Sequence, residues 1–489
     1  MEGKKDYRPH YHAYIKKGWC NDPNGLIYFN GKMHLFFQHY PYKAEWGQMH
    51  WAHVCTEDFV KWEDLPLTLE PDQEYEVENG CCSGSTIEVD GKMYLMYTAA
   101  QMERQRQCLA VSKDGIHFRK DPNNPILTAE MLSEEVNTAD FRDPKVFVHN
   151  GLYYALCGVR INDPAATVEK GGYGNMILMH SEDLYHWEYN GYLFHHQDDL
   201  DEAFFHLDGV YECPDYFESN GTEIVISSPQ FLPQMGHEYE NIHSMLYMEG
   251  QLDFETGHFH IHSVHELDGG FDIYAAQLLR MPDGRKVMIA WKEMWDRSFP
   301  TRSEGWAGTY TLPRVISFHD ERLYQEPVAE IEAYRRNEVS LSEETLCDTS
   351  RAFDGIEGDC IELSVVFEVG DAKRVGLVVF AGEEHETVLY YDVEQSAVIF
   401  DRTKGGIPIE GKEENVNTRT CDIEPSDRVE FRVFLDISSV ELFINGGRYT
   451  MTGNVYPDPE DQGIQFFAEG GTARIISATK YDIVVQSHT

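Results

Sequence analysis

The chain has 489 residues, of which 42% are hydrophobic and 25% charged, and its 84 acidic against 40 basic residues give a formal net charge of −44. This composition is typical of a folded globular protein, and the length predicts two or more domains. The acidic balance argues against binding to nucleic acid or to an anionic membrane surface, because both require a basic footprint. No apolar run approaches the roughly 18 residues of a membrane span, and the N-terminus has no apolar core of an export signal.

The ten cysteines show neither metal-ligand spacing nor the spacing of a disulfide framework. Together with the missing export signal, this favours reduced thiols in the cytoplasm. No cofactor and no metal are expected from the sequence.

A weak internal repeat is the most informative feature of the chain before Arg314. An Asn-Gly or Asp-Gly pair precedes an apolar run five times at near-even intervals: Asn30-Gly31, Asp90-Gly91, Asn150-Gly151, Asn220-Gly221 and Asp283-Gly284. Each pair predicts a tight β-hairpin. Such turns also recur by chance in all-β proteins, but the regular spacing favours radial repetition.

A second signal, Ser or Thr followed two residues later by Asp and then by an aromatic residue, occurs in residues 56–62, 112–118 and 181–187. It is expected to close the outer part of a unit. The two signals together predict a five-bladed β-propeller of about four strands per blade over residues 1–325.

After Arg314 the repeat stops. Residues 326–345 are expected to form a short helical linker, because Glu330, Ile331, Tyr334 and Arg335 have helical spacing. Alternating apolar strands then return, and residues 346–489 are predicted to form a β-sandwich, which makes the chain all-β.

The repeat also predicts where ligands bind. The innermost strand of each blade starts at the central funnel, so residues seven to nine positions before each hairpin turn should lie at its mouth. These residues are Asp22, Ser83, Asp143, Glu212 and Tyr274, of which three are carboxylates. Asp22 and Asp143 each precede a proline, which favours an extended conformation for both.

Converging carboxylates suit glycosidic bond cleavage. One must be ionised to attack the anomeric carbon, and another must hold a proton for the leaving oxygen. Repulsion and partial desolvation separate their pKa values. The alternative is a calcium or magnesium site, which ranks lower because no D-x-D-x-D-G loop is present.

At these positions the sequence resembles glycoside hydrolase family 32, the family of invertases, fructanases and sucrose-6-phosphate hydrolases. The resemblance spans most of the propeller and reaches into the tail. Its motifs are Arg8-Pro-His-Tyr-His12, Asn21-Asp-Pro-Asn-Gly25, Phe36-Phe-Gln38, Trp46-Gly47, Trp51-Ala-His53, Ser83-Gly-Ser85, Arg142-Asp-Pro144, Glu212-Cys213, Tyr274-Ala-Ala-Gln277, Gly305-Trp-Ala-Gly308, Leu312-Pro-Arg314 and Asp436-Ile-Ser-Ser-Val-Glu441.

The resemblance implies that Asp22 is the nucleophile, Glu212 the general acid/base and Asp143 a stabiliser of the transition state. It also implies a fructose subsite lined by Asn21, Gln38, Trp46, Cys82, Ser83, Arg142, Cys213, Tyr274 and Trp291. Two positions depart from the family pattern: Cys82 stands where phenylalanine is usual, and Phe37 lacks the hydroxyl of the usual tyrosine. Both affect the shape of the subsite rather than the reaction.

The expected function is that of a retaining β-fructofuranosidase acting on sucrose, sucrose 6-phosphate or short fructo-oligosaccharides. A fructosyltransferase with the same chemistry and a non-catalytic sugar-binding propeller are the alternatives. Lys292, Arg297 and Arg302 could meet a substrate phosphate, although surface salt bridges are the favoured interpretation for them. A small sugar is the expected partner, neither nucleic acid nor a membrane is expected, and a homo-oligomer is allowed.

Overall fold

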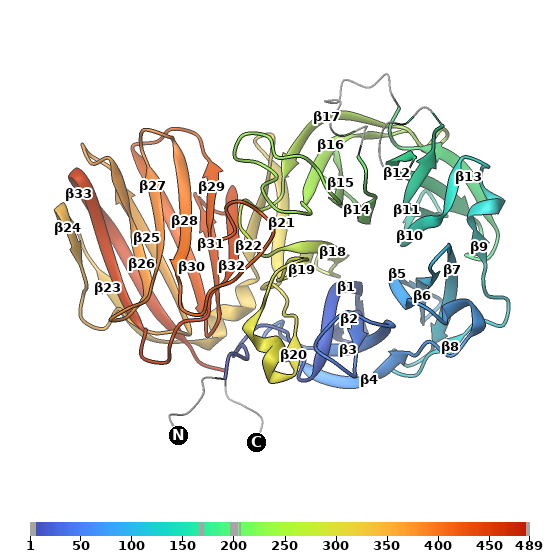
Figure 1. Cartoon of the computed structure of the whole chain (residues 1–489), viewed down its shortest axis with the longest axis horizontal. Helices are drawn as coiled ribbons and strands as arrows, with labels where there is room; N and C mark the ends of the chain where they lie inside the picture. Colours follow the sequence, from blue (N-terminus) through green and yellow to red (C-terminus); the bar gives the residue numbers. More distant parts are fainter. Residues whose placement is uncertain (1–5, 165, 167–170, 196–203, 205–206, 486–489) are drawn as a thin grey trace.

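The computed structural model of the chain describes residues 6–485 except 165, 167–170, 196–203 and 205–206. Figure 1 shows two units side by side: a ring of sheets from the first two thirds of the chain, and a layered β-unit from the last third. The prediction of a five-bladed propeller followed by a sandwich is confirmed by the strand pairing.

Five antiparallel sheets form the blades. Blade I contains β1 (Gly18–Phe29), β2 (Lys32–Tyr40), β3 (His50–Thr56) and β4 (Glu63–Leu69); blade II contains β5 (Gly80–Val89), β6 (Lys92–Gln101), β7 (Arg104–Ser112), β8 (Arg119–Lys120) and β9 (Leu127–Thr128). Blade III contains β10 (Val136–His149), β11 (Leu152–Asn162), β12 (Gly172–Ser181) and β13 (Trp187–Tyr192); blade IV contains β14 (Tyr211–Ser219), β15 (Thr222–Pro229), β16 (Leu246–Leu252) and β17 (Phe259–Glu266). Blade V contains β18 (Tyr274–Arg280), β19 (Lys286–Trp291), β21 (Arg314–His319) and β22 (Arg322–Pro327).

The first strand of every blade faces the centre, where β1, β5, β10, β14 and β18 contact one another in a closed ring. Between β19 and β21 the chain leaves blade V and lays β20 (Trp306–Ala307) alongside β1, pairing Gly18 with Trp306 and Trp19 with Ala307. The last blade therefore fastens to the first, which leaves the inner edge of blade I covered.

The predicted hairpin turns connect the first two strands of each blade. In the first four turns both residues have positive φ, as in Asn30 (49°) and Gly31 (83°), which is the pattern of a type I′ turn. The fifth turn differs, because only Gly284 (90°) has positive φ and the loop runs from Arg280 to Lys286.

The Ser/Thr-x-Asp signals lie between the third and fourth strands of blades I to III. In each case the aspartate caps the turn: Asp58 Oδ1 accepts the N–H groups of Val60 and Lys61 at 3.0 and 2.8 Å, and Asp114 and Asp183 do the same in their blades. The signal thus closes the outer part of these blades, as expected.

The helical linker between the units is shorter than the predicted span 326–345. Only η4 (Ala329–Tyr334) is helical, as one short 3-10 helix, and β23 (Arg335–Leu341) and β24 (Glu344–Arg351) already pair with the last strand. Ile331 is buried, as the helical spacing predicts, but the helix ends at Tyr334 after about two turns. The strand β23 was not predicted because residues Arg335 to Glu338 are polar. They lie in an edge strand whose side chains face water.

The C-terminal unit pairs its strands in the order β29-β28-β27-β26-β33-β25-β30-β31-β32, and β23 and β24 also pair with β33. The strands are β25 (Ile361–Glu368), β26 (Arg374–Ala381), β27 (Glu386–Asp392), β28 (Ala397–Lys404), β29 (Thr418–Asp422), β30 (Arg428–Asp436), β31 (Ser439–Ile444), β32 (Tyr449–Asn454) and β33 (Gly463–Ile483). Alternate residues of these strands fill one apolar core, to which Phe271 from the propeller also belongs.

Three further 3-10 helices, η1 (Glu74–Glu76), η2 (Ala129–Met131) and η3 (Pro300–Glu304), lie in loops of the propeller. None of the helices in the described part of the chain is long and apolar enough to cross a membrane.

Candidate active site

All five first strands lose their regular pairing at the same level of the funnel. Register shifts occur between Cys20 and Pro23, Cys82 and Gly84, Arg142 and Lys145, Glu212 and Asp215, and Tyr274 and Gln277. The residues predicted to line the funnel mouth, Asp22, Ser83, Asp143, Glu212 and Tyr274, all lie at these shifts. Bulges of this kind turn side chains away from the sheet face, and here they turn polar groups toward the propeller axis.

Three residues at these shifts hold an unusual backbone, and one of them is Ala275, with a φ of 56°. The other two are Asp143 and Cys213, with φ values of 60° and 46°, a conformation that most residues adopt only at a cost of about 1–2 kcal/mol. The extended conformation predicted for Asp143 from the proline that follows it is therefore wrong. Strain of this kind is characteristic of functional sites. It is maintained here because the N–H of Cys213 donates to Asp143 Oδ2 at 3.0 Å, which ties the two bulges together.

Asp22 is buried and accepts several hydrogen bonds. Gln38 Nε2 and Ser83 Oγ donate to its Oδ2 at 2.7 and 2.6 Å, and Asn21 Nδ2 donates to its Oδ1 at 3.1 Å. The thiol of Cys213 lies 3.5 Å from Oδ2. Donors arranged in this way stabilise the ionised carboxylate and fix its orientation.

Glu212 is held by one cation and one hydroxyl. Arg142 Nε donates to Glu212 Oε1 at 3.1 Å, and the Tyr274 hydroxyl donates to Oε2 at 2.6 Å. Arg142 is in turn oriented by Asp140, which accepts from Nη1 at 2.6 Å. The Glu212 side chain keeps 17% of its surface exposed, so a leaving group or a water molecule can reach it.

Crowding of carboxylates in a buried funnel changes their acidity. Burial, followed by the charge of Glu212, raises the pKa of Asp143 to about 7. Burial and Glu212 also raise the pKa of Asp22, and the hydrogen bonds from Ser83 and Asn21 oppose that rise. The site therefore resists holding three negative charges at once, and it keeps a proton near neutral pH.

The arrangement favours glycosidic chemistry over the cation site considered above. Arg142 already places a positive charge between Asp140 and Glu212. Among the described residues, the group whose possible ligand atoms all lie within 4.8 Å of one another is His385, Asp458 and Asp461, and it lies in the C-terminal unit rather than in the funnel.

Aromatic residues form one side of the site. The Trp19 indole N–H donates to Asn21 Oδ1 at 2.8 Å, and the Tyr310 hydroxyl donates to the Asn21 carbonyl at 2.7 Å. Trp46 lies in the loop after β2 with 43% of its surface exposed. Trp291, expected to line the subsite, is fully buried and packs against Trp19 with ring centroids 5.6 Å apart, so it supports that wall from behind.

Cys82 lies on β5 next to Ser83, half-buried, and its carbonyl accepts the Trp51 indole N–H at 3.0 Å. Burial raises the pKa of its thiol far above the ordinary value. The thiol is therefore neutral, and the side chain contributes shape rather than charge to the subsite.

The surface salt bridges favoured for the three basic residues near Trp291 are not what the structure shows. Lys292 is fully buried and donates to Ser439 Oγ at 2.7 Å, and Arg297 is buried in ion pairs with Asp272 at 2.5 Å and with Glu413 at 2.7 Å. Both residues link the propeller to the C-terminal unit. That unit covers this face of the propeller, so the two side chains are buried. Arg302 forms no ion pair with the described residues.

Sequence reasoning missed Thr98, Ser228 and Tyr310. The Thr98 hydroxyl accepts the N–H of Asp143 at 3.0 Å, and Ser228 Oγ accepts the N–H of Ala275 at 3.1 Å. Each supports a bulge from the second strand of a blade, where the repeat gives no positional signal. Tyr310 follows the Gly305-Trp-Ala-Gly308 motif by two residues, so the motif itself pointed toward it.

Three carboxylates at the mouth of a propeller funnel suit the cleavage of a glycosidic bond. The sequence model of the glycosyl hydrolases family 32 N-terminal domain matches residues 12–327, and that of the family 32 C-terminal domain matches residues 330–482. The chain belongs to glycoside hydrolase family 32 and is a glycoside hydrolase.

Known proteins of this family are similar over nearly the whole chain. A sucrose-6-phosphate hydrolase of Zymomonas mobilis is 34% identical, covering 96% of this chain and 90% of its own length, and a raffinose invertase of Escherichia coli is 33% identical over 96% and 94%. The structure of a sucrose-6-phosphate hydrolase from Lactobacillus gasseri superposes with a TM-score of 0.84 at 29% identity, covering 98% of this chain and 93% of that one. The β-fructofuranosidase BmSUC1 of Bombyx mori gives 0.80 at 31% identity, with 98% and 94% covered.

Proposed function

We propose that this glycoside hydrolase is a retaining β-fructofuranosidase with Asp22 as nucleophile, Glu212 as general acid/base and Asp143 as stabiliser of the transition state. The observation that carries the proposal is the junction at Cys213, whose N–H binds Asp143 and whose thiol lies 3.5 Å from Asp22, while Glu212 precedes it in the chain. One tied bulge thus brings together all three carboxylates.

In the first step a carboxylate oxygen of Asp22 attacks C2 of the fructosyl unit and the bond from C2 to the glycosidic oxygen breaks. The proton of the Glu212 carboxyl passes to that oxygen, so the leaving sugar departs as an alcohol. In the second step Glu212 takes a proton from water, the water oxygen bonds to C2, and the ester to Asp22 breaks.

The contacts of each carboxylate suit its role. The three donors to Asp22 hold the attacking oxygen in place without adding a full positive charge that would suppress its nucleophilicity. Asp143 can accept the fructose hydroxyls, whose hydrogen bonds strengthen as positive charge develops on the ring. The subsite residues Asn21, Gln38, Ser83, Arg142, Cys213 and Tyr274 each contact one of these carboxylates.

Sucrose, sucrose 6-phosphate and short fructo-oligosaccharides are the proposed substrates, because the relatives include sucrose-6-phosphate hydrolases and a raffinose invertase. All ten cysteines are free thiols, which supports the proposal of a cytoplasmic protein.

The experiment compares the wild type with Asp22→Asn and Glu212→Gln on sucrose. Each replacement preserves the shape of the side chain, and each is expected to lower kcat by about 10⁴-fold or more. Circular dichroism and the melting temperature control for folding. Full activity in either folded variant contradicts the assignment, and it would favour a sugar-binding propeller whose carboxylates only hold hydroxyls.

The same assay separates hydrolysis from transfer. Equal amounts of free glucose and free fructose report water as the acceptor, whereas a deficit of fructose with new oligosaccharides reports a fructosyltransferase.

A further inference from the structure

A cavity of about 550 Å³ adjoins the fructosyl site on the side of Trp19. Its walls come from both units: the loop of Trp46, the segment from Trp295 to Arg302, and residues 410–412 of the C-terminal unit. Trp19 separates this cavity from the nucleophile, since its indole N–H holds Asn21, which donates to Asp22. The cavity is therefore placed to receive the part of a substrate beyond the fructosyl ring.

Arg302 is the cation of this cavity that the rest of the protein leaves available. Its guanidinium lies over the rings of Trp19 and Phe299, 5.2 and 5.7 Å from their centroids. It forms no ion pair or side-chain hydrogen bond within the part of the chain that the structure describes, and its Nε is buried without a partner. Aromatic stacking fixes the plane of the guanidinium while leaving its N–H groups for an external acceptor.

The acidic groups near Arg302 do not neutralise its positive charge. Glu293 is the carboxyl that its charge reaches, but burial raises the pKa of Glu293 to about 8, which leaves that group mostly protonated at neutral pH. At the rim Lys412 pairs with Asp296 at 2.8 Å and Glu45 pairs with Lys43 at 3.0 Å, and Glu410 completes the acidic groups. In a chain of net charge −44, a positive group held in this way is a local exception.

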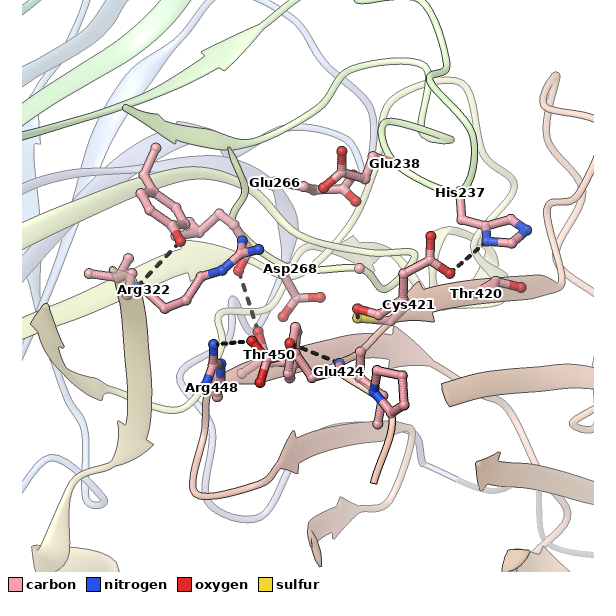
Figure 2. A pocket seen from close by; sticks show the side chains of 18 residues that line it. His237, Glu238, Glu266, Asp268, Arg322, Thr420, Cys421, Glu424, Arg448 and Thr450 are labelled. Atoms are coloured by element: carbon pink, nitrogen blue, oxygen red, sulfur yellow. Dashed lines mark hydrogen bonds and ion pairs between the residues drawn. The ribbon is translucent and has the colours of Figure 1, made fainter. Parts of the chain in front are cut away.

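A second cavity, of about 350 Å³ between blades IV and V and the C-terminal unit, has the opposite character (Figure 2). Its carboxylates are Glu238, Glu266, Asp268, Asp422 and Glu424, and its basic groups are His237, Arg322 and Arg448. Arg448 already pairs with Glu424 at 2.7 Å and His237 with Asp422 at 2.8 Å. This cavity suits no anion, and it supplies a matched control position in Arg322.

We propose that Arg302 determines specificity by binding a phosphate group on the leaving sugar, as in the 6-phosphoglucosyl unit of sucrose 6-phosphate. This inference rests on the proposed fructosidase function. A guanidinium presents two parallel N–H groups to two phosphate oxygens, and partial desolvation over Trp19 strengthens both hydrogen bonds. Lys412 stands at the same rim with its ammonium on Asp296, so it can add a second, weaker contact.

The test measures kcat/KM for sucrose 6-phosphate and for sucrose in the wild type, Arg302→Gln, Arg302→Lys and the control Arg322→Gln. The wild type is expected to prefer the phosphorylated substrate. Arg302→Gln is expected to reduce the ratio of the two kcat/KM values by about 10- to 100-fold, mainly through KM, because one charge-assisted contact is lost. Arg302→Lys is expected to keep part of the preference, and Arg322→Gln is expected to keep the ratio.

Product inhibition gives a second readout. Glucose 6-phosphate is expected to inhibit sucrose hydrolysis by the wild type more strongly than glucose does, and Arg302→Gln is expected to remove that difference. An unchanged ratio in Arg302→Gln, or a wild type without preference for the phosphorylated substrate, overturns the inference while sucrose hydrolysis upholds the proposed function. A wild type that hydrolyses neither sucrose nor sucrose 6-phosphate contradicts the proposed function itself.

Discussion

The funnel and the interface between the two units both bury several carboxylates, but the partners of these carboxylates differ, and their pKa values shift in opposite directions. In the funnel Arg142 is the neighbouring cation of Glu212 and Asp143, whereas Asp22 is held by neutral donors, and burial raises the pKa of both aspartates. At the interface Asp272, Asp436 and Glu441 each have basic partners. His12 lies between Asp436 and Glu441 at 2.7 and 2.9 Å, and Arg314 binds Glu441 at 2.6 Å.

Acidity follows from this difference in partners. Burial acts to raise the pKa of Glu441, but Arg314 and His12 outweigh it and hold that pKa far below the ordinary value. The same balance lowers the pKa of Asp436, where His12 opposes burial, and of Asp272, where Arg402 and Arg297 do. Burial alone therefore does not identify a catalytic carboxylate, because the partners of the buried group decide whether its pKa rises or falls.

The largest effect on stability is expected from Glu441→Gln, which leaves Arg314 and His12 without their shared anion. Breaking a buried ion network by removing one partner costs about 3–5 kcal/mol. For a unit of this size the loss corresponds to a fall of roughly 10 °C in the melting temperature. Differential scanning calorimetry measures it, with the exposed Glu386→Gln as control, which is expected to change the melting temperature by no more than about 1 °C.

The pH dependence of that variant sharpens the comparison. Because the pKa of Glu441 is lower in the folded state, its stabilisation is complete above the ordinary glutamate value of 4.5 and declines as the pH falls below it. The difference in melting temperature between the wild type and Glu441→Gln is therefore expected to be largest at neutral pH and to become smaller in acid. A gap that does not depend on pH would show that packing, not charge, accounts for the loss.

A smaller effect of opposite sign is expected from Asp143→Asn. The pKa of Asp143 is raised to about 7, so its ionised form is penalised in the folded state, and that penalty grows as the pH rises from 3.8 toward 7. Removing the charge is expected to raise the melting temperature by a few degrees at pH 8 and by less at pH 5. Asparagine also tolerates the positive φ of this position and can accept the N–H of Cys213.

Activity on sucrose is expected to fall by about 10²-fold or more in the same variant, because in the proposed mechanism Asp143 accepts the fructose hydroxyls. The proposed role of Asp143 is that its charge lowers the stability of the fold and is needed for activity. A lower melting temperature of Asp143→Asn at pH 8, or a higher one with full activity, would contradict that role.

The propeller was predictable because its signals are local. An Asn-Gly or Asp-Gly turn needs only two residues, and five such turns gave the spacing from which the inner strands and the funnel residues were counted. The start of the C-terminal unit was mispredicted, since Arg335 and its neighbours form an edge strand whose polar side chains carry no alternation.

The pairing of His12 with Asp436 and Glu441 lay beyond sequence reasoning, because the partners come from opposite ends of the chain. For the same reason Lys292 and Arg297 were mistaken for surface residues: their partners come from another unit of the chain. The bulges that aim Asp143 and Glu212 also depend on tertiary contacts, among them the hydroxyls of Thr98 and Ser228.

The most direct test of the proposed mechanism is the capture of the fructosyl-enzyme. In Glu212→Gln, β-D-fructofuranosyl fluoride can still react, because fluoride leaves without a proton, whereas the second step lacks its base. Peptide mass spectrometry of the quenched protein is then expected to find one fructosyl unit on the peptide that contains Asp22, and none when Asp22→Asn is added. A fructosyl unit on another residue, or fluoride turnover without any covalent species, would contradict the account.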